Sequence, residues 1–267
     1  MLYFVSTPIG NLKDITLRAV EVLKSVDVIA CEDKRHSLPL LNAYDIKKPL
    51  TSYQKFNEEK VAPEIVALLK EGKNVAVISD AGTPVLSDPG AVLARKLREE
   101  GLEYTVIPGA NALLPALILS ALDCGNFAFI GFLPPKRGQI ERLLSSYENL
   151  PCPLVFYCAP HDLDETVKVL YEILGDRKAC AVKEITKIHE TAIPFRLKDG
   201  ISVDERGEFV IVVEGAKKGF EFKELSVEEH IAAYTESGMS KMDAIKAVAK
   251  ERGVPKNSLY KYIVDKK

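Results

Sequence analysis

Through the first 110 residues of this chain, short runs of apolar residues alternate with segments that have the periodicity of amphipathic helices. The predicted strands are 2–6, 26–31, 74–79 and 104–107, and the predicted helices are 15–25, 58–71 and 89–100, with Asp14 as the N-cap of the first helix. Runs that are apolar at nearly every position fit strands buried on both faces. Strands that alternate with helices along the chain indicate a mainly parallel sheet covered by helices on both sides.

The alternation begins again after residue 110 and then changes. Strands are predicted at 127–132 and 154–157, and helices at 112–122, 140–148 and 163–174. Three strand-like segments follow with no helix between them, at 179–185, 191–197 and 208–214. Strands that follow one another without a crossover helix pair antiparallel, so this second sheet should be mixed. We therefore predict an α/β protein with two α/β domains, at residues 1–110 and 111–222.

The last part of the chain, residues 223–267, is predicted to be a small helical and basic segment. Ser240 is a suitable N-cap for a helix at 241–252, Gly253 ends that helix, and Pro255 starts another. Between residues 241 and 267 there are eight Lys or Arg against three Asp or Glu. This helix–turn–helix-like rhythm fits either an appendage that docks on RNA or a helical pair that only packs.

Net charge and composition limit the classes of partner. A net charge of −2 argues against a protein that coats nucleic acid with its whole surface, so contact with a polyanion must come from a local patch. Five cysteines without a C-x-x-C pair indicate reduced thiols in the cytoplasm, and four scattered histidines predict no metal site. The N-terminus lacks the features of a signal peptide. The longest apolar stretch, 112–122, is too short to cross a membrane.

The loop after the first predicted strand excludes two common nucleotide sites. In open parallel sheets, ligands bind beyond the carboxyl ends of the strands. The loop at 7–12 reads TPIGNL and lacks the G-x-G-x-x-G of dinucleotide folds, and the chain has no G-x-x-x-x-G-K-[ST] loop. NAD and nucleoside triphosphates are therefore disfavoured, although the small residues of this loop allow a ligand to approach the backbone.

Other loops carry candidate chemistry. Residues 32–36 are five ionisable side chains in a row, which form either a solvated loop or an acid–base and phosphate-contacting cluster. Residues 79–90, SDAGTPVLSDPG, contain turns and prolines that favour an ordered binding loop. Residues 183–190 alternate charged with apolar side chains, as an exposed strand does. Residues 132–138 form a proline-stiffened basic loop suited to phosphates.

Taken in order, these segments resemble the tetrapyrrole methylase superfamily of S-adenosylmethionine-dependent enzymes. Within it they are similar to the bacterial 16S ribosomal RNA (cytidine-2′-O)-methyltransferases. The resemblance covers residues 1–216 closely and the C-terminal helices more loosely. The matching stretches are TPIGNL at 7–12, DITLR at 14–18, ED at 32–33, RH at 35–36, SDAGTP at 79–84, SDPG at 87–90, PG at 108–109, GFLP at 131–134, KRG at 136–138, EITK at 184–187, HE at 189–190 and GEFV at 207–210.

The resemblance implies a homodimer whose chains each bind S-adenosylmethionine in the cleft between two α/β domains. It implies that the cofactor is bound by Pro8, Gly10, Ser79, Asp80, Ala81, Gly82, Pro84, Pro108, Gly109 and Tyr157. The segments around Lys34, 53–57 and Asp162 depart from the family pattern. These departures concern loops that face the substrate and leave the cofactor segments intact.

The resemblance also implies methyl transfer to the ribose 2′-hydroxyl of a cytidine in small-subunit ribosomal RNA, as free RNA or as the assembled subunit. Such a hydroxyl reacts well only when a base takes its proton or a cation stabilises its oxyanion. The base stays open among the ionisable residues of 32–36 and of 183–187. The hypothesis is that Arg35 and Lys187 anchor phosphates while Asp33 or Glu184 handles the hydroxyl. RNA contacts are predicted at Glu32, His36, Lys136, Arg137, Lys256 and Lys261.

Three other functions fit parts of the sequence. A precorrin- or uroporphyrinogen-type tetrapyrrole C-methyltransferase of the same superfamily would need no basic tail, and the cluster at 32–36 favours RNA. A DNA-binding regulator acting through the C-terminal helices leaves the loop at 79–90 unexplained. A cofactor-binding sensor without catalysis is the third. The sequence does not identify the modified nucleotide.

Overall fold

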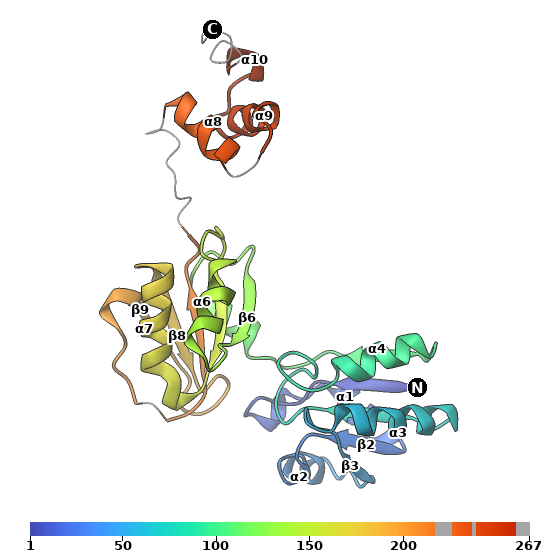
Figure 1. The fold of residues 1–267 in the computed structure, drawn as a ribbon. Coiled ribbons are helices and arrows are strands. Elements are labelled where there is room, and N and C mark those ends of the chain that lie inside the picture. The colour runs from blue at the N-terminus through green and yellow to red at the C-terminus, as the bar shows by residue number, and fades with distance from the viewer. Residues whose placement is uncertain (205, 217–225, 237–238, 260–267) are drawn as a thin grey trace. The chain divides into compact units, whose positions relative to one another are not determined.

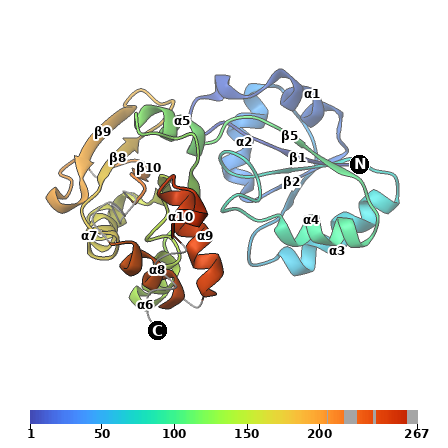
Figure 2. The same cartoon turned by 90° about the horizontal axis from the view of Figure 1, so that it is seen from above.

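A computed structural model of the chain describes residues 1–204, 206–216, 226–236 and 239–259. It divides into two compact units, Met1–Gly215 and Ala216–Lys267, each of which is described here by itself. Figures 1 and 2 show the larger unit as two sheets, each with helices packed against it. The three-part division at 1–110, 111–222 and 223–267 stays a prediction.

The first sheet has five parallel strands in the order β3-β2-β4-β1-β5. The parallel prediction is confirmed, and the core lies on both faces of the sheet, against α3 and α4 on one and against α1 and α2 on the other (Figure 2). Its strands are β1 (Leu2–Val5), β2 (Val28–Cys31), β3 (Leu50–Ser52), β4 (Val75–Ile78) and β5 (Tyr104–Ile107). Its helices are η1 (Leu12–Asp14), α1 (Leu17–Ser25), α2 (Lys34–Ala43), α3 (Glu58–Lys70) and α4 (Ala91–Glu99).

Two local predictions in this sheet need correction. The N-cap of α1 is Thr16 and not Asp14, because the Thr16 hydroxyl accepts from the amide of Ala19 at 3.1 Å while Asp14 lies in the short helix η1. Neither β3 nor α2 was predicted. Helix α2 forms although Pro39 lies inside it, since the Asp33 carboxylate accepts from the amide of Arg35 at 2.8 Å and caps its first turn.

The second sheet has the strand order β6-β7-β10-β8-β9 and is mixed, as predicted. Strands β6 and β7 pair in parallel, and the other three pairings are antiparallel. Helices α6 and α7 pack on one face and α5 on the other. The strands are β6 (Ala128–Phe132), β7 (Leu154–Cys158), β8 (Lys178–Lys183), β9 (Thr191–Arg196) and β10 (Phe209–Val213). The helices are α5 (Leu113–Leu119), α6 (Arg137–Ser145), η2 (Pro160–Asp162), α7 (Leu163–Leu174) and η3 (Leu197–Asp199).

The smaller unit contains α8 (Val227–Glu236), α9 (Lys241–Glu251) and α10 (Lys256–Leu259). The predicted cap of α9 is confirmed, because the Ser240 hydroxyl accepts from the amide of Asp243 at 3.2 Å. Ile231, Ile245, Val248 and Leu259 belong to the buried cluster that joins these helices. Among the described residues, no helix is both long and apolar enough to cross a membrane.

Candidate active site

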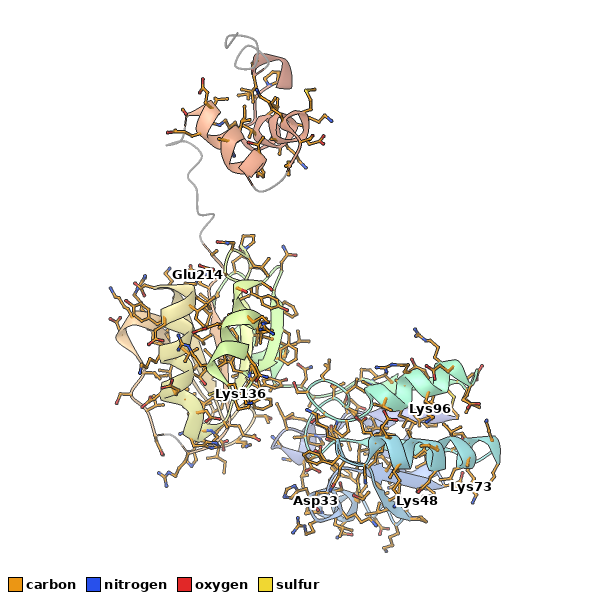
Figure 3. The ribbon with its side chains drawn as sticks, viewed as in Figure 1. Asp33, Lys48, Lys73, Lys96, Lys136 and Glu214 are labelled. Atoms are coloured by element: carbon orange, nitrogen blue, oxygen red, sulfur yellow. The ribbon has the colours of Figure 1, made fainter. Side chains whose placement is uncertain are left out.

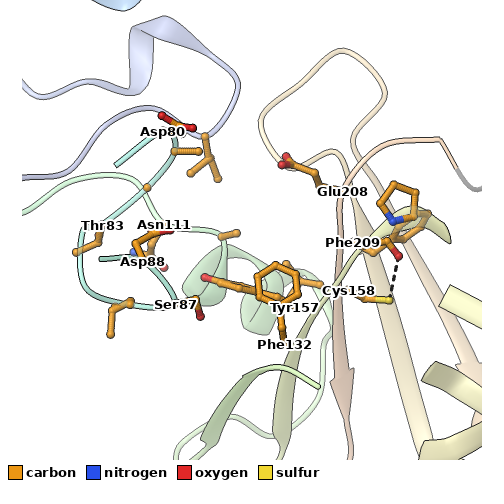
Figure 4. Close-up of a pocket in the computed structure, with 18 residues that line it drawn as sticks. Asp80, Thr83, Ser87, Asp88, Asn111, Phe132, Tyr157, Cys158, Glu208 and Phe209 are labelled. Carbon is orange, nitrogen blue, oxygen red and sulfur yellow. Dashed lines mark hydrogen bonds between the residues drawn. The ribbon is translucent and has the colours of Figure 1, made fainter. Parts of the chain in front are cut away.

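A cavity of about 390 Å³, called here the main cavity, is lined by both halves of Met1–Gly215. Figure 4 shows Asp80 and Glu208 on opposite sides of it, with the rings of Phe132 and Tyr157 at its base. Much of its wall comes from segments that follow β1, β4 and β7. The lining residues are Ile9, 80–83, 86–88, Asn111, Ala112, Phe132, 157–160 and 208–210.

The loop after β4 is held in one conformation by backbone hydrogen bonds to the loop after β1. Thr7 and Gly82 exchange two of them, at 2.8 and 3.1 Å. Gly82 has φ +82°, a left-handed conformation that glycine adopts without strain. Further along, Val85 and Ser87 also have positive φ, at 79° and 72°. This loop is therefore irregular and tied to its neighbour, and its role in binding stays a prediction.

Asp88, at the far end of this loop, is the most perturbed carboxyl group of the main cavity. Its burial, together with the negative charges of Glu32 and Asp80, raises its pKa from 3.8 to about 6. Burial and the nearby Asp88 also raise the pKa of Tyr157. Asp88 was not among the predicted site residues, although its segment, SDPG, was among the motifs that match the family. A carboxyl group with a raised pKa in a cavity is a candidate functional group.

A second cavity of about 270 Å³, the side cavity, adjoins the first. Ile9, Asp80, Ala81 and Glu208 line both cavities. The remaining lining residues of the side cavity are Pro8, Gly10, Leu12, 36–37, Pro39, Leu40, Ile78, Ser79 and Lys187. The two cavities together can hold two molecules side by side, as a group transfer requires.

The predicted base Asp33 is committed to other contacts. Its carboxylate caps α2 and accepts from the Arg35 guanidinium, with Nη2–Oδ2 at 2.6 Å. The hydrogen bonds from Arg35 lower the pKa of Asp33 to about 2, which makes it a weak base. Asp33 and Arg35 line neither cavity, and the Arg35 side chain is 87% exposed.

His36 and Asp80 form a pair beside Asp33. The His36 Nδ1 lies 3.0 Å from Asp80 Oδ2, and Asp80 Oδ1 accepts from the backbone amide of Asp33 at 3.0 Å. The hydrogen bond and charge of Asp80 raise the pKa of His36. Burial, Asp80 and Asp33 raise the pKa of Glu32, which lines neither cavity.

The prediction of an alternating strand at 183–190 is wrong. Strand β8 ends at Lys183, and Glu184 and Thr186 have positive φ of 51° and 68°, so the chain turns back toward β9. The Glu184 carboxylate accepts from the Lys187 ammonium at 2.9 Å and from the Glu208 amide at 3.0 Å. A strand cannot form here because left-handed residues break the pleat, and the Glu184 side chain takes the place of a ladder partner.

Lys187 connects this turn to the first sheet's side of the cavity. Its Nζ donates to Glu184 and, at 3.0 Å, to Glu208, and its aliphatic chain crosses directly over Gly10. A Cβ at residue 10 would lie 2.6 Å from Lys187 Cγ, so any larger residue would displace the Lys187 side chain. Thr186 adds a hydrogen bond to Asp14. Burial alone would raise the pKa of Glu184, but the hydrogen bonds from Glu208 and Lys187 outweigh it and lower the pKa.

The structure brings nine of the predicted site residues to the two cavities and leaves nine others outside both. Those that line at least one cavity are Pro8, Gly10, His36, Ser79, Asp80, Ala81, Gly82, Tyr157 and Lys187. Those that line neither are Glu32, Asp33, Arg35, Pro84, Pro108, Gly109, Lys136, Arg137 and Glu184. Gly109 has a packing role instead, since a Cβ there would lie 2.9 Å from Ser6 Cβ.

The predicted RNA contacts outside the cavities lie on several elements. Figure 3 shows Lys136 on the second-sheet half of Met1–Gly215, and Glu32 follows strand β2 of the first sheet. Lys136 precedes α6, and Arg137 is paired with Glu141 and Glu172 at 2.8 and 2.7 Å. Lys256 begins α10, its side chain lies outside what the structure describes, and Lys261 lies outside the described residues.

Sequence reasoning missed Asp88, Asn111 and Glu208 in the main cavity. Glu208 follows the glycine of GEFV, and that motif was the available signal.

All five cysteines are free thiols. Within the described ranges, no group of three or more His, Cys, Asp or Glu side chains is arranged to hold a metal ion.

The fold and the site correspond to a known family. Residues 1–201 match the model of the Tetrapyrrole (Corrin/Porphyrin) Methylases. The chain belongs to the tetrapyrrole methylase family. Its similarity to the solved structure titled methyltransferase CobJ has a TM-score of 0.63 at 19% identity, covering 80% of this chain and 94% of that one. A uroporphyrin-III C-methyl transferase from Thermus thermophilus, complexed with S-adenyl homocysteine, has a TM-score of 0.57 at 19% identity, covering 79% and 96%. These two likenesses show the fold.

Within that family, the chain is similar to proteins named ribosomal RNA small subunit methyltransferase I. The protein of that name from Bacillus subtilis (strain 168) is 41% identical over 270 residues, which cover 97% of this chain and 92% of that protein. The one from Thermotoga maritima is 43% identical over 218 residues, which cover 80% of this chain and 98% of that protein.

Proposed function

We propose that this methyltransferase transfers a methyl group from S-adenosylmethionine to the ribose 2′-hydroxyl of a cytidine in small-subunit ribosomal RNA. The observation that carries the proposal is the pair of adjoining cavities that share Asp80 and Ala81, one suited to a cofactor and the other to an acceptor. The relatives at about 40% identity, named for ribosomal RNA, favour this acceptor over a tetrapyrrole.

The main cavity fits S-adenosylmethionine in size and in chemistry. Its volume of about 390 Å³ lies within the usual range of small-molecule sites. Ile9, Leu86 and Phe132 supply apolar surface for an adenine ring, and the carboxyl groups of Asp80 and Asp88 complement a sulfonium and an ammonium group. Gly82 leaves room for the ligand to approach the backbone.

The predicted cofactor residues then divide into two roles. Asp80, Ala81, Gly82 and Tyr157 contact the cofactor. The others, Pro8, Gly10, Ser79, Pro84, Pro108 and Gly109, shape the loops that form the site. In the same way, Glu184 orients Lys187, whose ammonium lines the side cavity where the RNA binds.

We also propose that Arg35 anchors a phosphate of the RNA at the mouth of the side cavity. Its guanidinium is exposed and is oriented by Asp33, and Arg35 directly precedes His36, the first residue of α2 that lines the side cavity. A guanidinium held in this way binds phosphate through two parallel hydrogen bonds. Lys136 adds a positive charge at the start of α6.

The smaller unit is proposed to help dock the RNA. Lys241, Lys246 and Lys250 are exposed on α9. The Thermotoga maritima relative is matched over 98% of its own length by 80% of this chain, so part of this chain has no counterpart in that protein. Deletion of residues 226–267 should weaken RNA binding and reduce its salt dependence while leaving cofactor affinity unchanged. Unchanged RNA affinity would show that these helices only pack.

We further propose that the protein is a cytoplasmic homodimer. Val106 on the edge strand β5 is 48% exposed, and Leu114 and Ile118 on α5 are 49% and 75% exposed, so these apolar side chains offer surface that a second copy of the chain would cover. Ile118→Glu should reduce the mass measured by light scattering to that of a monomer. Val254→Glu, an exposed position in the smaller unit, is the control.

The function is tested with labelled S-adenosylmethionine and four acceptors: unmethylated small subunits, free 16S RNA, a tetrapyrrole and no acceptor. Digestion of the RNA and mass spectrometry should identify 2′-O-methylcytidine in one of the RNA samples. Label in the tetrapyrrole alone would establish the C-methyltransferase alternative. Binding of the cofactor without transfer to any acceptor would instead establish a sensor.

A further inference from the structure

His36 and Asp80 lie at the passage from the main cavity to the side cavity. Asp80 lines both cavities, whereas His36 lines only the side cavity. The imidazole side chain is 66% exposed and that of Asp80 31% exposed, so a ligand in the side cavity can reach the ring. In Figure 4 Asp80 lies on the first-sheet side of the main cavity.

The hydrogen bonds of this pair determine which ring nitrogen is available. A carboxylate accepts hydrogen bonds only, so His36 Nδ1 carries the hydrogen that Asp80 Oδ2 accepts at 3.0 Å. The other oxygen of Asp80 is held by the Asp33 amide at 3.0 Å, which orients the carboxylate. The neutral ring therefore has its lone pair on Nε2, and no described residue donates a hydrogen bond to that atom. Carboxylate and imidazole are arranged as in a hydrolase triad, without the serine.

We infer that His36 is the general base that takes the proton of the acceptor hydroxyl, and that Asp80 is its positioning residue. The inference rests on the proposed function and names the base for that reaction. The hydroxyl proton moves to His36 Nε2, and the oxygen's electron pair bonds to the methyl carbon as the carbon–sulfur bond breaks and leaves its pair on sulfur.

The charges around His36 suit a base that works near neutral pH. Asp80 raises its pKa, Asp33 adds to this effect, and Arg35 opposes it. Glu32 interacts with it from the end of β2, and Lys187 and Glu208 line the same cavity from the second sheet. A base is most effective when its pKa is close to the working pH. The two predicted carboxylate bases lack either a suitable pKa or access to the acceptor. Asp33 has a pKa of about 2, and Glu184 lines neither cavity.

The alternative role for His36 is a cation that binds a phosphate of the RNA. The two roles have opposite pH dependence. A base must be neutral, so kcat/KM falls as the pH is lowered through the pKa of His36. A phosphate anchor must be protonated, so kcat/KM falls as the pH is raised through the same pKa.

The test combines rates with a measurement that needs neither cofactor nor RNA. His36→Gln should lower kcat by about 10²-fold or more, remove the acidic limb of the pH profile, and leave S-adenosylmethionine affinity unchanged. Asp80→Asn should lower the pKa of His36, measured by NMR titration of the ring, and shift the acidic limb to lower pH. His161→Gln is the matched control, because His161 is also an exposed histidine beside an aspartate, at 3.5 Å from Asp162, and lines neither cavity.

Three results would overturn the inference. They are a kcat near that of the wild type in His36→Gln, a loss confined to KM for RNA, or an unchanged His36 pKa in Asp80→Asn. A wild-type protein that methylates no RNA would instead refute the proposed function. The NMR titration still reports whether the pair exists in that case, so the two failures are distinguishable.

Discussion

The two sides of the candidate site are built from charged residues of similar kind, yet they differ in how those charges are compensated. On the side of the first sheet, burial and neighbouring carboxylates raise the pKa of Asp88 to about 6 and raise that of Glu32. On the side of the second sheet, hydrogen bonds lower the pKa of Glu184. A group such as Asp88, with a pKa of about 6, can exchange protons near neutral pH, whereas a carboxylate whose oxygens already accept hydrogen bonds stays ionised and fixes the positions of its donors.

The difference follows from the two kinds of sheet. In the first, parallel strands all end at one edge, so the residues after β2 and β4 bring Glu32, Asp80 and Asp88 close together. In the second, the antiparallel strands β8 and β9 are joined by a turn whose charges pair with one another and with Glu208. We therefore propose that proton chemistry belongs to the first side and positioning to the second.

The largest expected effect is loss of cofactor binding in Gly82→Val. Gly82 has φ +82°, and its new Cβ would lie 3.4 Å from Ile9 Cγ2 in the main cavity. The strain and the filled space should weaken S-adenosylmethionine binding by roughly 10- to 100-fold, measured by calorimetry. Gly101→Val is the control, because Gly101 also has positive φ but no atom within 4 Å of the added Cβ. If both variants lose the same affinity for S-adenosylmethionine, the cause is backbone strain in the whole protein and not the filled cavity.

Glu184→Ala should mainly destabilise the protein. The Glu184 side chain is 19% exposed, and its removal leaves the Glu208 amide without its acceptor and Lys187 with one carboxylate fewer. The expected loss is about 1–3 kcal/mol in the free energy of unfolding, measured with denaturant. Glu184→Gln should lose less, since its amide oxygen can still accept from Glu208. If the folded Glu184→Ala protein keeps its stability but has no transfer activity, the second side takes part in the chemistry and the comparison fails.

Cofactor affinity should depend on pH through Asp88. The positive charge of S-adenosylmethionine favours the ionised carboxylate, and below the pKa of about 6 binding must displace a proton. Affinity should therefore increase by up to about tenfold as the pH is raised from about 5 to about 7. For the unliganded protein the sign is opposite, because a raised carboxyl pKa gives stability that is lost as the pH rises through about 6.

The controls for this dependence are a variant and a ligand. Asp88→Asn should remove the dependence, and S-adenosylhomocysteine, which lacks the sulfonium charge, should show less of it. A pH dependence that persists unchanged in Asp88→Asn would assign the effect to another group.

The smallest expected effect is that of Arg35→Gln. The guanidinium is exposed and pairs only with Asp33 among the described residues, so melting should change little. If Arg35 binds a phosphate, RNA affinity should fall and the salt slope of binding should decrease by about one. Fluorescence titration at several salt concentrations measures this. If RNA affinity falls but its salt dependence does not change, Arg35 does not bind a phosphate and acts by orienting Asp33.

Much of the fold could be predicted because apolar periodicity is a local property. The strand Tyr104–Ile107 and the helix Leu163–Leu174 have the predicted bounds. Helix α2 could not be predicted in this way, since its cap, Asp33, stands in a charged run and Pro39 interrupts the pattern. The turn at 184–190 was predicted as a strand because alternation of charged and apolar residues says nothing about the left-handed backbone of Glu184 and Thr186.

The loops of the site could be predicted better than the roles of their residues. TPIGNL and the loop at 79–90 were identified from their small residues and turns, and they form walls of both cavities. Asp33 and Glu184 were chosen as proton acceptors because they are carboxylates in matching motifs. Their pKa values depend on hydrogen bonds from Arg35 and Glu208, which the order of residues does not show.

By itself, the sequence determined the alternation of strands and helices, the mixed second sheet and the positions of the ligand loops, because these depend on neighbours along the chain. Only the tertiary structure decided which carboxylates accept hydrogen bonds that lower their pKa and which lie buried beside other negative charges that raise it. It places Asp80 between two cavities and against His36, 44 residues away in the chain. Proton affinity depends on burial and on charges within a few ångströms, and those distances exist only after folding.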